Sequence, residues 1–299
     1  MIYDIRHLTT YRYDAPVTFS RCALSLTPDA DGQRLLSHRI EVRPAEARRT
    51  ERTSFFGHRV VGVRIEAAHR ELRVEARSRV AVARAAPPLL APAWEQVRDE
   101  ALTEASLLPA SPVHYLRASR LVPLPDPIAA YAQESFPPRR PVWEGAHELA
   151  RRIKADFRFD PEATQVSTPV MDAFEGRHGV CQDFAHIMLA CLRGIGVPAA
   201  YASGYLRTRP PPGQARLEGA DATHAWVRVW CGRAHGWAGL DPTNGIVVAQ
   251  DHVSVAAGRD YADVSPIDGV IVGAASQHLA VAVDMVPVEG PAEVGQAAL

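Results

Sequence analysis

Cysteine is scarce in this sequence of 299 residues, and its placement narrows the possible classes of protein. The four cysteines are far apart and form no CxxC pair: Cys22, Cys181, Cys191 and Cys231. This spacing argues against a disulfide framework and fits a reduced, cytoplasmic protein.

Long apolar runs and a strong net charge are also absent. No segment approaches about 18 uninterrupted apolar residues, so we expect no transmembrane helix. The polar, alternating start MIYDIRHLTTYRYD lacks the apolar stretch of a signal peptide. With a net charge of −1, the chain has no electrostatic reason to bind nucleic acid or an anionic membrane. Nothing predicts a cofactor or a metal, and the oligomeric state stays open.

Residues 1–85 alternate apolar and polar side chains, as half-buried strands do. The runs with this period are YDIRHLTTYRY, HRIEVRP, RVVGVRIEA and ELRVEARSRVAV. Four such runs with turn residues between them predict a separate, β-sandwich-like amino-terminal domain. Residues 86–140 are crowded with proline and predict a connector, with short helices in WEQVRDEALTEAS and DPIAAYAQES.

Residues 141–275 change from helical to strand patterns and predict an α+β core. Apolar spacing predicts a helix in WEGAHELARRIKADFRF. A second helix is expected in TPVMDAFEGRHG, with Thr168 as N-cap and Pro169 at the first helical position. A third begins at Cys181, and strands follow in AAYASGYL, HAWVRVW and GWAGLDP.

The carboxyl-terminal part gives weaker patterns. Residues 246–272 look irregular apart from a short strand in GVIVGA. Residues 276–299 predict a final strand, QHLAVAVDMVPVE, followed by a flexible tail.

The segment HGVCQDFAHIMLACLRGIGVP, residues 178–198, places a cysteine at the start of a nearly all-apolar helix. Such a helix should be central and buried. A thiol becomes nucleophilic as the thiolate, which a helix N-terminus and a neighbouring histidine both favour. Cys181 is therefore either a buried inert residue or a nucleophile, and a suitable histidine decides between them.

His224 is that histidine, near the start of the strand in HAWVRVW. A turn leads to a second strand that ends at Asp241. If the hairpin is centred between Gly232 and Arg233, His224 lies directly opposite Asp241 on one face. The carboxylate then orients the imidazole, and the other ring nitrogen faces Cys181. The backbone N–H of Cys181 is a candidate donor to a tetrahedral oxyanion.

These residues resemble the transglutaminase-like superfamily. GVCQDFAHIMLACLRGIGVPAAYASGYL resembles its cysteine motif, THAWVRVW its histidine motif and WAGLDPTNG its aspartate motif. HLTTYRYDAPV, followed by SLTP, resembles the β-rich region that precedes such cores in bacterial proteins. HVSVAAGRDYADVSPIDGVIVG resembles the segment that follows the core in the same group.

The resemblance implies a papain-like core and acyl transfer through a thioester, with Cys181, His224 and Asp241 as catalytic residues. The expected fold class is therefore α+β, a papain-like or transglutaminase-like core with a separate amino-terminal β-sandwich-like domain. The substrate would be a peptide or another amide. The acyl acceptor stays open between an amine and water, as in a cysteine peptidase or amidase, and an inactive binding module on the same fold is a further alternative. The sequence has no carboxylate-rich loop suited to calcium.

Other side chains near the motifs have structural interpretations. We expect His186 to be structural or a contact of the site, and His178 and Asp221 to be loop residues. A zinc site of His178, Cys181 and Asp183 matches no standard ligand spacing. Asp183 is expected to accept a hydrogen bond at the helix start. The indoles of Trp226 and Trp237 belong either to the core or to a groove wall.

Overall fold

The structure, a computed structural model, describes residues 1–29, 31–208, 222–274 and 276–288. The period-two pattern of the first 85 residues forms six strands: β1 (Ile2–Val17), β2 (Phe19–Leu24), β3 (Gln33–Arg43), β4 (Arg48–Thr53), β5 (Arg59–Ile65) and β6 (His69–Val82). Burial alternates along β1 and β6, which have one face against a core and the other exposed.

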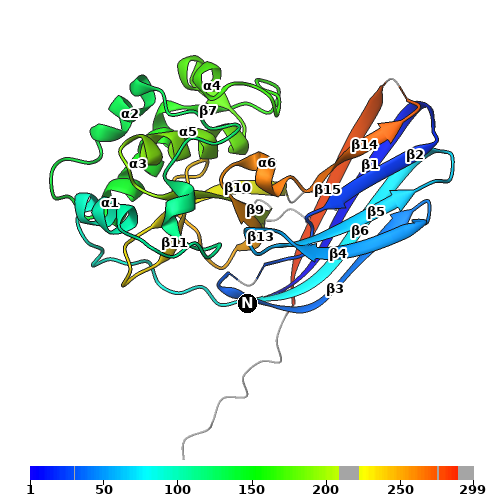
Figure 1. The fold of residues 1–299 in the computed structure, drawn as a ribbon, viewed down its shortest axis with the longest axis horizontal. Helices are drawn as coiled ribbons and strands as arrows, with labels where there is room; N and C mark the ends of the chain where they lie inside the picture. Colours follow the sequence, from blue (N-terminus) through cyan, green and yellow to red (C-terminus); the bar gives the residue numbers. More distant parts are fainter. Residues whose placement is uncertain (30, 209–221, 275, 289–299) are drawn as a thin grey trace, which may run out of the picture.

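Two strands from the carboxyl-terminal end complete the sheets of this amino-terminal part. They are β14 (Ile267–Val272), which pairs with β2, and β15 (Gln277–Val288), which pairs with β1. The two antiparallel sheets have the orders β15-β1-β6-β3 and β14-β2-β5-β4. Both ends of the described chain therefore contribute to the sandwich at the right of Figure 1.

The connector contains short helices, as predicted. The first half of the core is helical, as the spacing of its apolar residues predicts. The elements are α1 (Trp94–Leu102), η1 (Pro112–Tyr115), α2 (Asp126–Gln133), α3 (Val142–Asp156), α4 (Val170–Gly176) and α5 (Cys181–Gly194). Short strands β7 (Arg158–Phe159) and β8 (His178–Gly179) pair with each other before α5.

The prediction that α4 begins after a Thr168 N-cap was wrong by one residue. Pro169 is the N-cap, and the Thr168 hydroxyl instead accepts the backbone N–H of Gln165, at 2.9 Å. That hydrogen bond keeps Thr168 in the preceding turn.

A five-stranded antiparallel sheet packs beside α5. Its order is β12-β11-β10-β9-β13. The strands are β9 (Ala199–Leu206), β10 (Ala222–Trp230), β11 (Trp237–Asp241), β12 (Ile246–Val247) and β13 (His252–Gly258). Residues 246–272 are thus not irregular as predicted: they hold β12, β13, helix α6 (Tyr261–Val264) and β14. Every residue of β13 is buried, which explains why its sequence shows no alternation.

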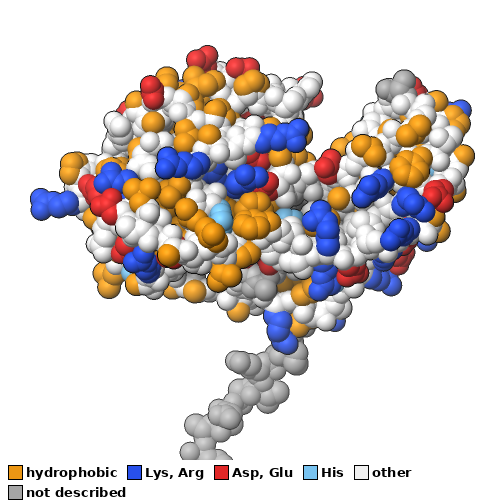
Figure 2. Space-filling view, viewed as in Figure 1, with side chains coloured by type: hydrophobic (Ala, Val, Ile, Leu, Met, Phe, Trp, Pro, Cys, Tyr) orange, Lys and Arg blue, Asp and Glu red, His pale blue; other side chains and the backbone are white. Residues whose placement is uncertain are grey.

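Strand β1 takes part in both apolar cores of the molecule. Tyr3 and Ile5, at the start of β1, belong to the same apolar cluster as Phe184 and Leu189 of α5. Tyr13, further along β1, packs in the smaller cluster inside the sandwich. The same long strand therefore contributes to both apolar cores, and Figure 2 shows the notch that is left between the two parts.

The described residues contain no helix that is both long and apolar enough to cross a membrane.

Candidate functional site

Cys181 is the first residue of α5, as its sequence context predicts. Asp183 organises this helix start: its Oδ2 accepts the Val180 backbone N–H at 2.8 Å and the Thr164 hydroxyl at 2.6 Å. A Cβ at Gly179 would lie 2.5 Å from the same oxygen, so the carboxylate fits only because residue 179 is glycine. The Cys181 N–H lies in the first helical turn, where amides have no intrahelical acceptor.

His224 and Asp241 form a buried pair at one end of the sheet. His224 Nε2 lies 2.8 Å from Asp241 Oδ2. The His224 side chain is 7% exposed and that of Asp241 is 0% exposed. Because Nε2 is bound to the carboxylate, Nδ1 is the nitrogen left for Cys181, whose side chain is near enough to raise the pKa of His224. The structure thus brings together the three residues that the sequence selected.

The predicted register of the hairpin was nevertheless wrong by two residues. In the structure Trp230 pairs with Trp237 and Val227 with Leu240, so residue i pairs with 467 − i rather than 465 − i. The turn is longer than assumed, because Cys231 N–H donates to Gly236 O around a loop that contains Gly232. Both glycines have positive φ, +90° and +65°. A shift of two leaves every side chain on its original face, so His224 still meets Asp241 diagonally.

The Asp241 carboxylate is fixed by its own turn as well as by His224. Its Oδ1 accepts the backbone N–H groups of Thr243, at 3.0 Å, and Asn244, at 3.2 Å. The Asn244 side-chain amide donates to Oδ2 at 2.7 Å. Burial opposes the charge, but the hydrogen bonds from His224, His252 and the Asn244 side chain outweigh it and hold the pKa of Asp241 well below its usual range. The motif DPTNG is therefore a carboxylate-holding turn.

Asp241 and Cys181 favour the protonated form of His224. Burial alone would lower the pKa of His224, but its hydrogen bonds to Asp241 and Cys181 outweigh burial and raise that pKa to about 10. The ring is therefore an imidazolium near neutral pH. A cation beside a thiol stabilises the thiolate, which is the nucleophilic form.

Cys181 differs in its surroundings from the other three cysteines. Cys181 is partly exposed, whereas burial raises the pKa of each of the other thiols: Cys22, Cys191 and Cys231. All four are free. The three buried cysteines are core residues, as predicted.

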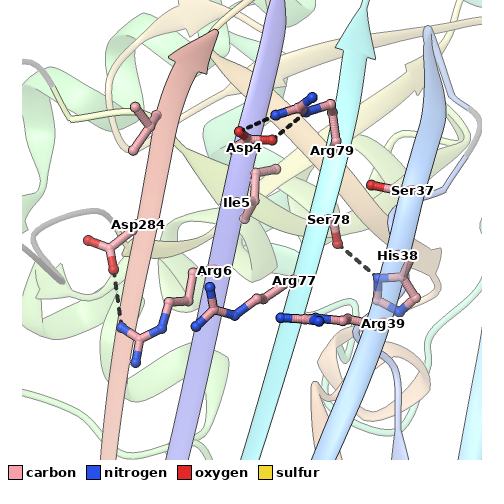
Figure 3. Close-up of a pocket in the computed structure, with 11 residues that line it drawn as sticks. Asp4, Ile5, Arg6, Ser37, His38, Arg39, Arg77, Ser78, Arg79 and Asp284 are labelled. Carbon is pink, nitrogen blue, oxygen red and sulfur yellow. Dashed lines mark hydrogen bonds and ion pairs between the residues drawn. The ribbon is translucent and has the colours of Figure 1, made fainter.

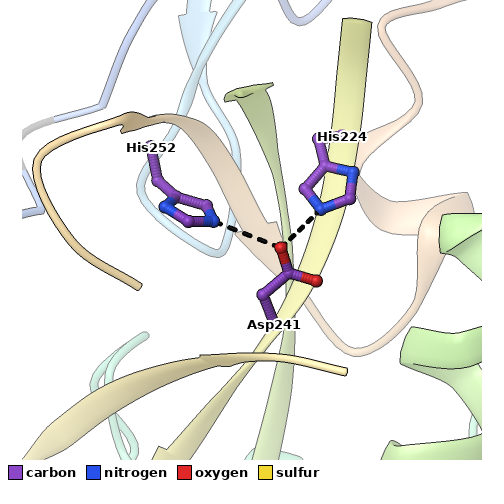
Figure 4. A group of neighbouring side chains, drawn as sticks. All are labelled: His224, Asp241 and His252. Carbon is purple, nitrogen blue, oxygen red and sulfur yellow. Dashed lines mark hydrogen bonds and ion pairs between the residues drawn. The ribbon is translucent and has the colours of Figure 1, made fainter. Parts of the chain in front are cut away.

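A second histidine, which the sequence analysis did not select, also contacts Asp241. His252 Nε2 lies 3.3 Å from the same Oδ2 atom (Figure 4). Its position as the first residue of β13, after the turn residue Asp251, gave no signal from periodicity. The one sequence feature that pointed to His252 was its position in HVSVAAGRDYADV, part of the stretch that resembles the segment following the core in the bacterial group.

His224, Asp241 and His252 also form a group of possible metal ligands, with ligand atoms within 4.8 Å of one another. Both Nε2 atoms and the Asn244 amide point at one carboxylate oxygen. A cation would have to displace these three hydrogen bonds, so the geometry fits a hydrogen-bonded unit better than a metal centre.

The remaining predicted residues take structural places. His186 is buried, its Nε2 accepts the backbone N–H of Tyr261 at 3.3 Å, and its ring lies against Tyr201. His178 is part of the two-residue strand β8 rather than a loop.

Trp226 is fully buried. Trp237 is partly buried and donates its indole N–H to Ala110 O at 3.0 Å. Asp221 lies outside the described residues.

The most voluminous of the surface cavities described lies away from these residues. It measures about 870 Å³ and covers the exposed face of the sheet that contains β1, β6 and β3. Arg6, Arg77 and Arg39 lie side by side across the three strands (Figure 3). Glu75 pairs with Arg6 at 3.2 Å and with Arg77 at 2.6 Å, so acidic neighbours compensate much of this charge. Ser78 and His38 line this face and lie 2.9 Å apart, but the other ring nitrogen of His38 bonds to the Thr27 hydroxyl at 3.0 Å rather than to a carboxylate, so the pair lacks an orienting anion.

Comparison with known families agrees with the motif analysis. The description "Bacterial transglutaminase-like N-terminal region" matches residues 3–81, and "Transglutaminase-like superfamily" matches residues 129–242. The second range includes Cys181, His224 and Asp241.

Sequence relatives cover nearly the whole chain. An uncharacterized protein of Mycobacterium tuberculosis is 40% identical over 302 residues, which is 97% of this chain and 94% of the relative. An uncharacterized protein of Mycobacterium leprae is 31% identical and covers 93% of this chain and 96% of its own length. A protein-glutamine gamma-glutamyltransferase of Pseudomonas aeruginosa is 33% identical over 103 residues, which is 32% of this chain and 15% of that protein.

A solved structure shares the fold across both parts of the chain. It is a protein of Cytophaga hutchinsonii described as a "Putative Cysteine Protease", with a TM-score of 0.73 and 19% sequence identity. The match covers 97% of this chain and 92% of that one. The fold class expected from the sequence, a papain-like α+β core with an amino-terminal β-rich region, is therefore confirmed.

Proposed function

Because the chain belongs to the transglutaminase-like superfamily, we propose that it is a cysteine enzyme that transfers the acyl group of a peptide or glutamine-type amide through a thioester. One observation carries this proposal. Cys181 acts on an imidazole, raising its pKa, and the Nε2 of that ring lies 2.8 Å from a buried carboxylate. A cysteine, a histidine and an orienting carboxylate in this order form the general arrangement of an activated nucleophile.

The first half-reaction forms the thioester. The Cys181 thiolate attacks the amide carbonyl carbon, and the carbonyl oxygen takes the negative charge of the tetrahedral intermediate. The C–N bond then breaks, and the His224 Nδ1–H gives its proton to the departing nitrogen, which leaves as ammonia or an amine. His224 is suited to this role because its raised pKa, about 10, keeps the proton available at neutral pH.

The second half-reaction regenerates the thiolate. Neutral His224 takes a proton from the incoming acceptor, the acceptor attacks the thioester carbonyl, and the C–S bond breaks. Asp241 stays ionised throughout and stabilises the imidazolium each time it forms.

The start of α5 supports the charge that develops on the carbonyl oxygen. The Cys181 N–H lies in the first turn, where helix amides favour an anion. Losing one such donor in other enzymes costs roughly 10²–10³-fold in rate, so this amide contributes as much as an acid–base residue does.

We propose an amine as the acceptor. The support is the partial similarity of this chain to a protein-glutamine gamma-glutamyltransferase, which is 33% identical over 103 residues. Water is the alternative acceptor and would make the protein an amidase or peptidase. The nucleophile, histidine and carboxylate serve both reactions equally, so the acceptor has to be measured.

The test uses a panel of blocked glutaminyl peptides, with and without a fluorescent alkylamine. Mass spectrometry detects the amine adduct, and an ammonia assay detects release of the leaving group. We expect an adduct with the wild type and none with Cys181→Ala. Cys191→Ala is the matched control, because that cysteine lies on the same helix, is fully buried and plays no part in the chemistry.

The outcomes separate the alternatives. Ammonia release without an adduct contradicts transfer to an amine and assigns hydrolysis. An adduct that persists in Cys181→Ala contradicts the assignment of the nucleophile. Absence of both products across the panel, from folded wild-type protein, favours an inactive binding module.

A further inference from the structure

His252 is placed to act on Asp241 from the side opposite His224. Its imidazole is 1% exposed and projects from β13, a strand that is separated from β10 by β9. Figure 4 shows the two histidine rings approaching one carboxylate oxygen from different strands. The distances to Asp241 Oδ2 are 2.8 Å from His224 and 3.3 Å from His252.

The hydrogen-bond pattern fixes which nitrogen of His252 carries the proton. The backbone N–H of Ala249 donates to His252 Nδ1 at 3.4 Å, so Nδ1 acts as an acceptor. In a neutral imidazole the proton must then lie on Nε2, which donates it to Asp241. Burial lowers the pKa of His252, although the Asp241 carboxylate opposes this effect, so the ring is neutral near pH 7.

Three charged groups of the described chain act most strongly on His252. Asp241 accepts its hydrogen bond, while the cations His224 and Arg84 both oppose a second proton on the ring. The Trp226 indole packs edge to face against the imidazole, with centroids 5.4 Å apart. His252 is therefore a fixed, neutral donor rather than a second acid–base group.

We propose that His252 is a positioning residue that holds the Asp241 carboxylate in the orientation that His224 requires. This role rests on the proposed function, because it acts through His224 on Cys181. Asn244 and the turn amides hold the carboxylate from the side of its own loop. Among the described residues His252 supplies the contact from β13, so the imidazole–carboxylate pair is also fixed to that strand.

The test compares His252→Gln with His252→Leu. A glutamine amide can place a donor close to the position of Nε2, whereas leucine is similar in size and cannot donate. The readout is the rate at which iodoacetamide alkylates Cys181 between pH 5 and 9, with the site identified by mass spectrometry. Circular dichroism melting shows whether each variant is folded.

We expect His252→Leu to alkylate about tenfold more slowly than the wild type at pH 6.5 and to recover at high pH. The loss is smaller than the roughly 10²-fold or more that an acid–base group supplies, because His252 acts only through His224. His252→Gln should stay within about threefold of the wild type, since its amide again donates one hydrogen bond to the Asp241 carboxylate. A merely structural role would change the melting temperature without changing the pH profile.

Two results would overturn the role. One is a folded His252→Leu whose pH profile matches the wild type, and the other is a folded His252→Gln whose profile matches His224→Ala. If His252→Leu does not fold, His252→Met takes its place in the comparison, because its side chain is similar in size and cannot donate. A wild type whose Cys181 is no more reactive than free cysteine contradicts the proposed function and this role together, which distinguishes the two failures.

Discussion

Gly204 of β9 lies directly against the indole of Trp226 on β10. A Cβ built on Gly204 would be 2.5 Å from Cη2 of Trp226 and 2.0 Å from the carbonyl oxygen of Val253 on β13. Gly204 is also the cross-strand partner of His224. Three neighbouring strands therefore meet at a position where a side chain cannot fit. The centroid of the Trp226 ring lies 6.3 Å from that of His224 and 5.4 Å from that of His252.

Gly204→Ala should therefore destabilise the whole protein as well as the site. The added methyl group meets backbone on one side, so relief requires a strand to move. Overpacking of a core typically costs about 1–3 kcal/mol, and we expect the upper end of that range. Urea denaturation measures the change. Gly236→Ala is an informative comparison, because its Cβ would meet nothing within 4 Å and its cost comes from positive φ alone. Equal, small losses in both variants would contradict the packing described here.

The charge on Asp241 sets the protonation of His224, and Asp241→Asn tests this. Removing an adjacent opposite charge typically shifts a pKa by about 1–3 units. We expect the pKa of His224 to fall from about 10 toward its ordinary value, because Cys181 then opposes burial without the charge of the carboxylate. An NMR titration of the His224 ring measures it directly. An unchanged His224 titration in a folded Asp241→Asn protein would refute the assigned cause.

The same pair makes stability depend on pH. The folded-state pKa of His224 is raised, so its stabilisation is complete below the unfolded value near 6.5 and is lost as the pH rises through about 10. The wild-type free energy of unfolding should therefore decline between pH 7 and pH 9.5. Asp241→Asn should show a much smaller decline over that range, which urea titrations at several pH values can compare. Parallel pH dependence in the two proteins would contradict the assignment.

Arg193 joins α5 to three segments of the core, and its removal should be costly. Its guanidinium donates to the backbone carbonyl of Ala199 at 2.7 and 2.9 Å and also to that of Arg259. It reaches the carbonyl of Arg117 at 3.4 Å as well. Arg193→Met leaves these buried acceptors without their donor, at about 1–3 kcal/mol for each unsatisfied group. A loss of 3 kcal/mol or more in urea denaturation is expected, while less than 1 kcal/mol would contradict this account.

The sequence predicted the elements that have a clear period and missed those that do not. Strict alternation identified β1, β3, β5 and β6 of the amino-terminal part but not β2 and β4, and apolar spacing with flanking glycines located the start of α5 at Cys181. β13 was not predicted, because both of its faces are buried and HVSVAAG is therefore an apolar run without a period of two. His252 was missed for the same reason.

The pairing of His224 with Asp241 was predicted for a partly wrong reason. The sequence shows that the two strands are antiparallel and which residues of each strand share a face. This places the side chains of His224 and Asp241 on one face. Register depends on the turn, and two glycines with positive φ at positions 232 and 236 lengthen it. The side-chain contact survived because an error of two residues keeps the face. An error of one would have separated the two residues.

The reactivity of Cys181 towards iodoacetamide at pH 6.5, compared between the wild type and His224→Ala, tests the central claim most directly. Burial keeps the thiols of Cys22, Cys191 and Cys231 protonated, so the labelled site is readable by mass spectrometry. We predict rapid, selective labelling of Cys181 in the wild type and a loss of about 10²-fold in His224→Ala, in line with the contribution of an acid–base partner. Equal rates in the two folded proteins would contradict activation of Cys181 by His224.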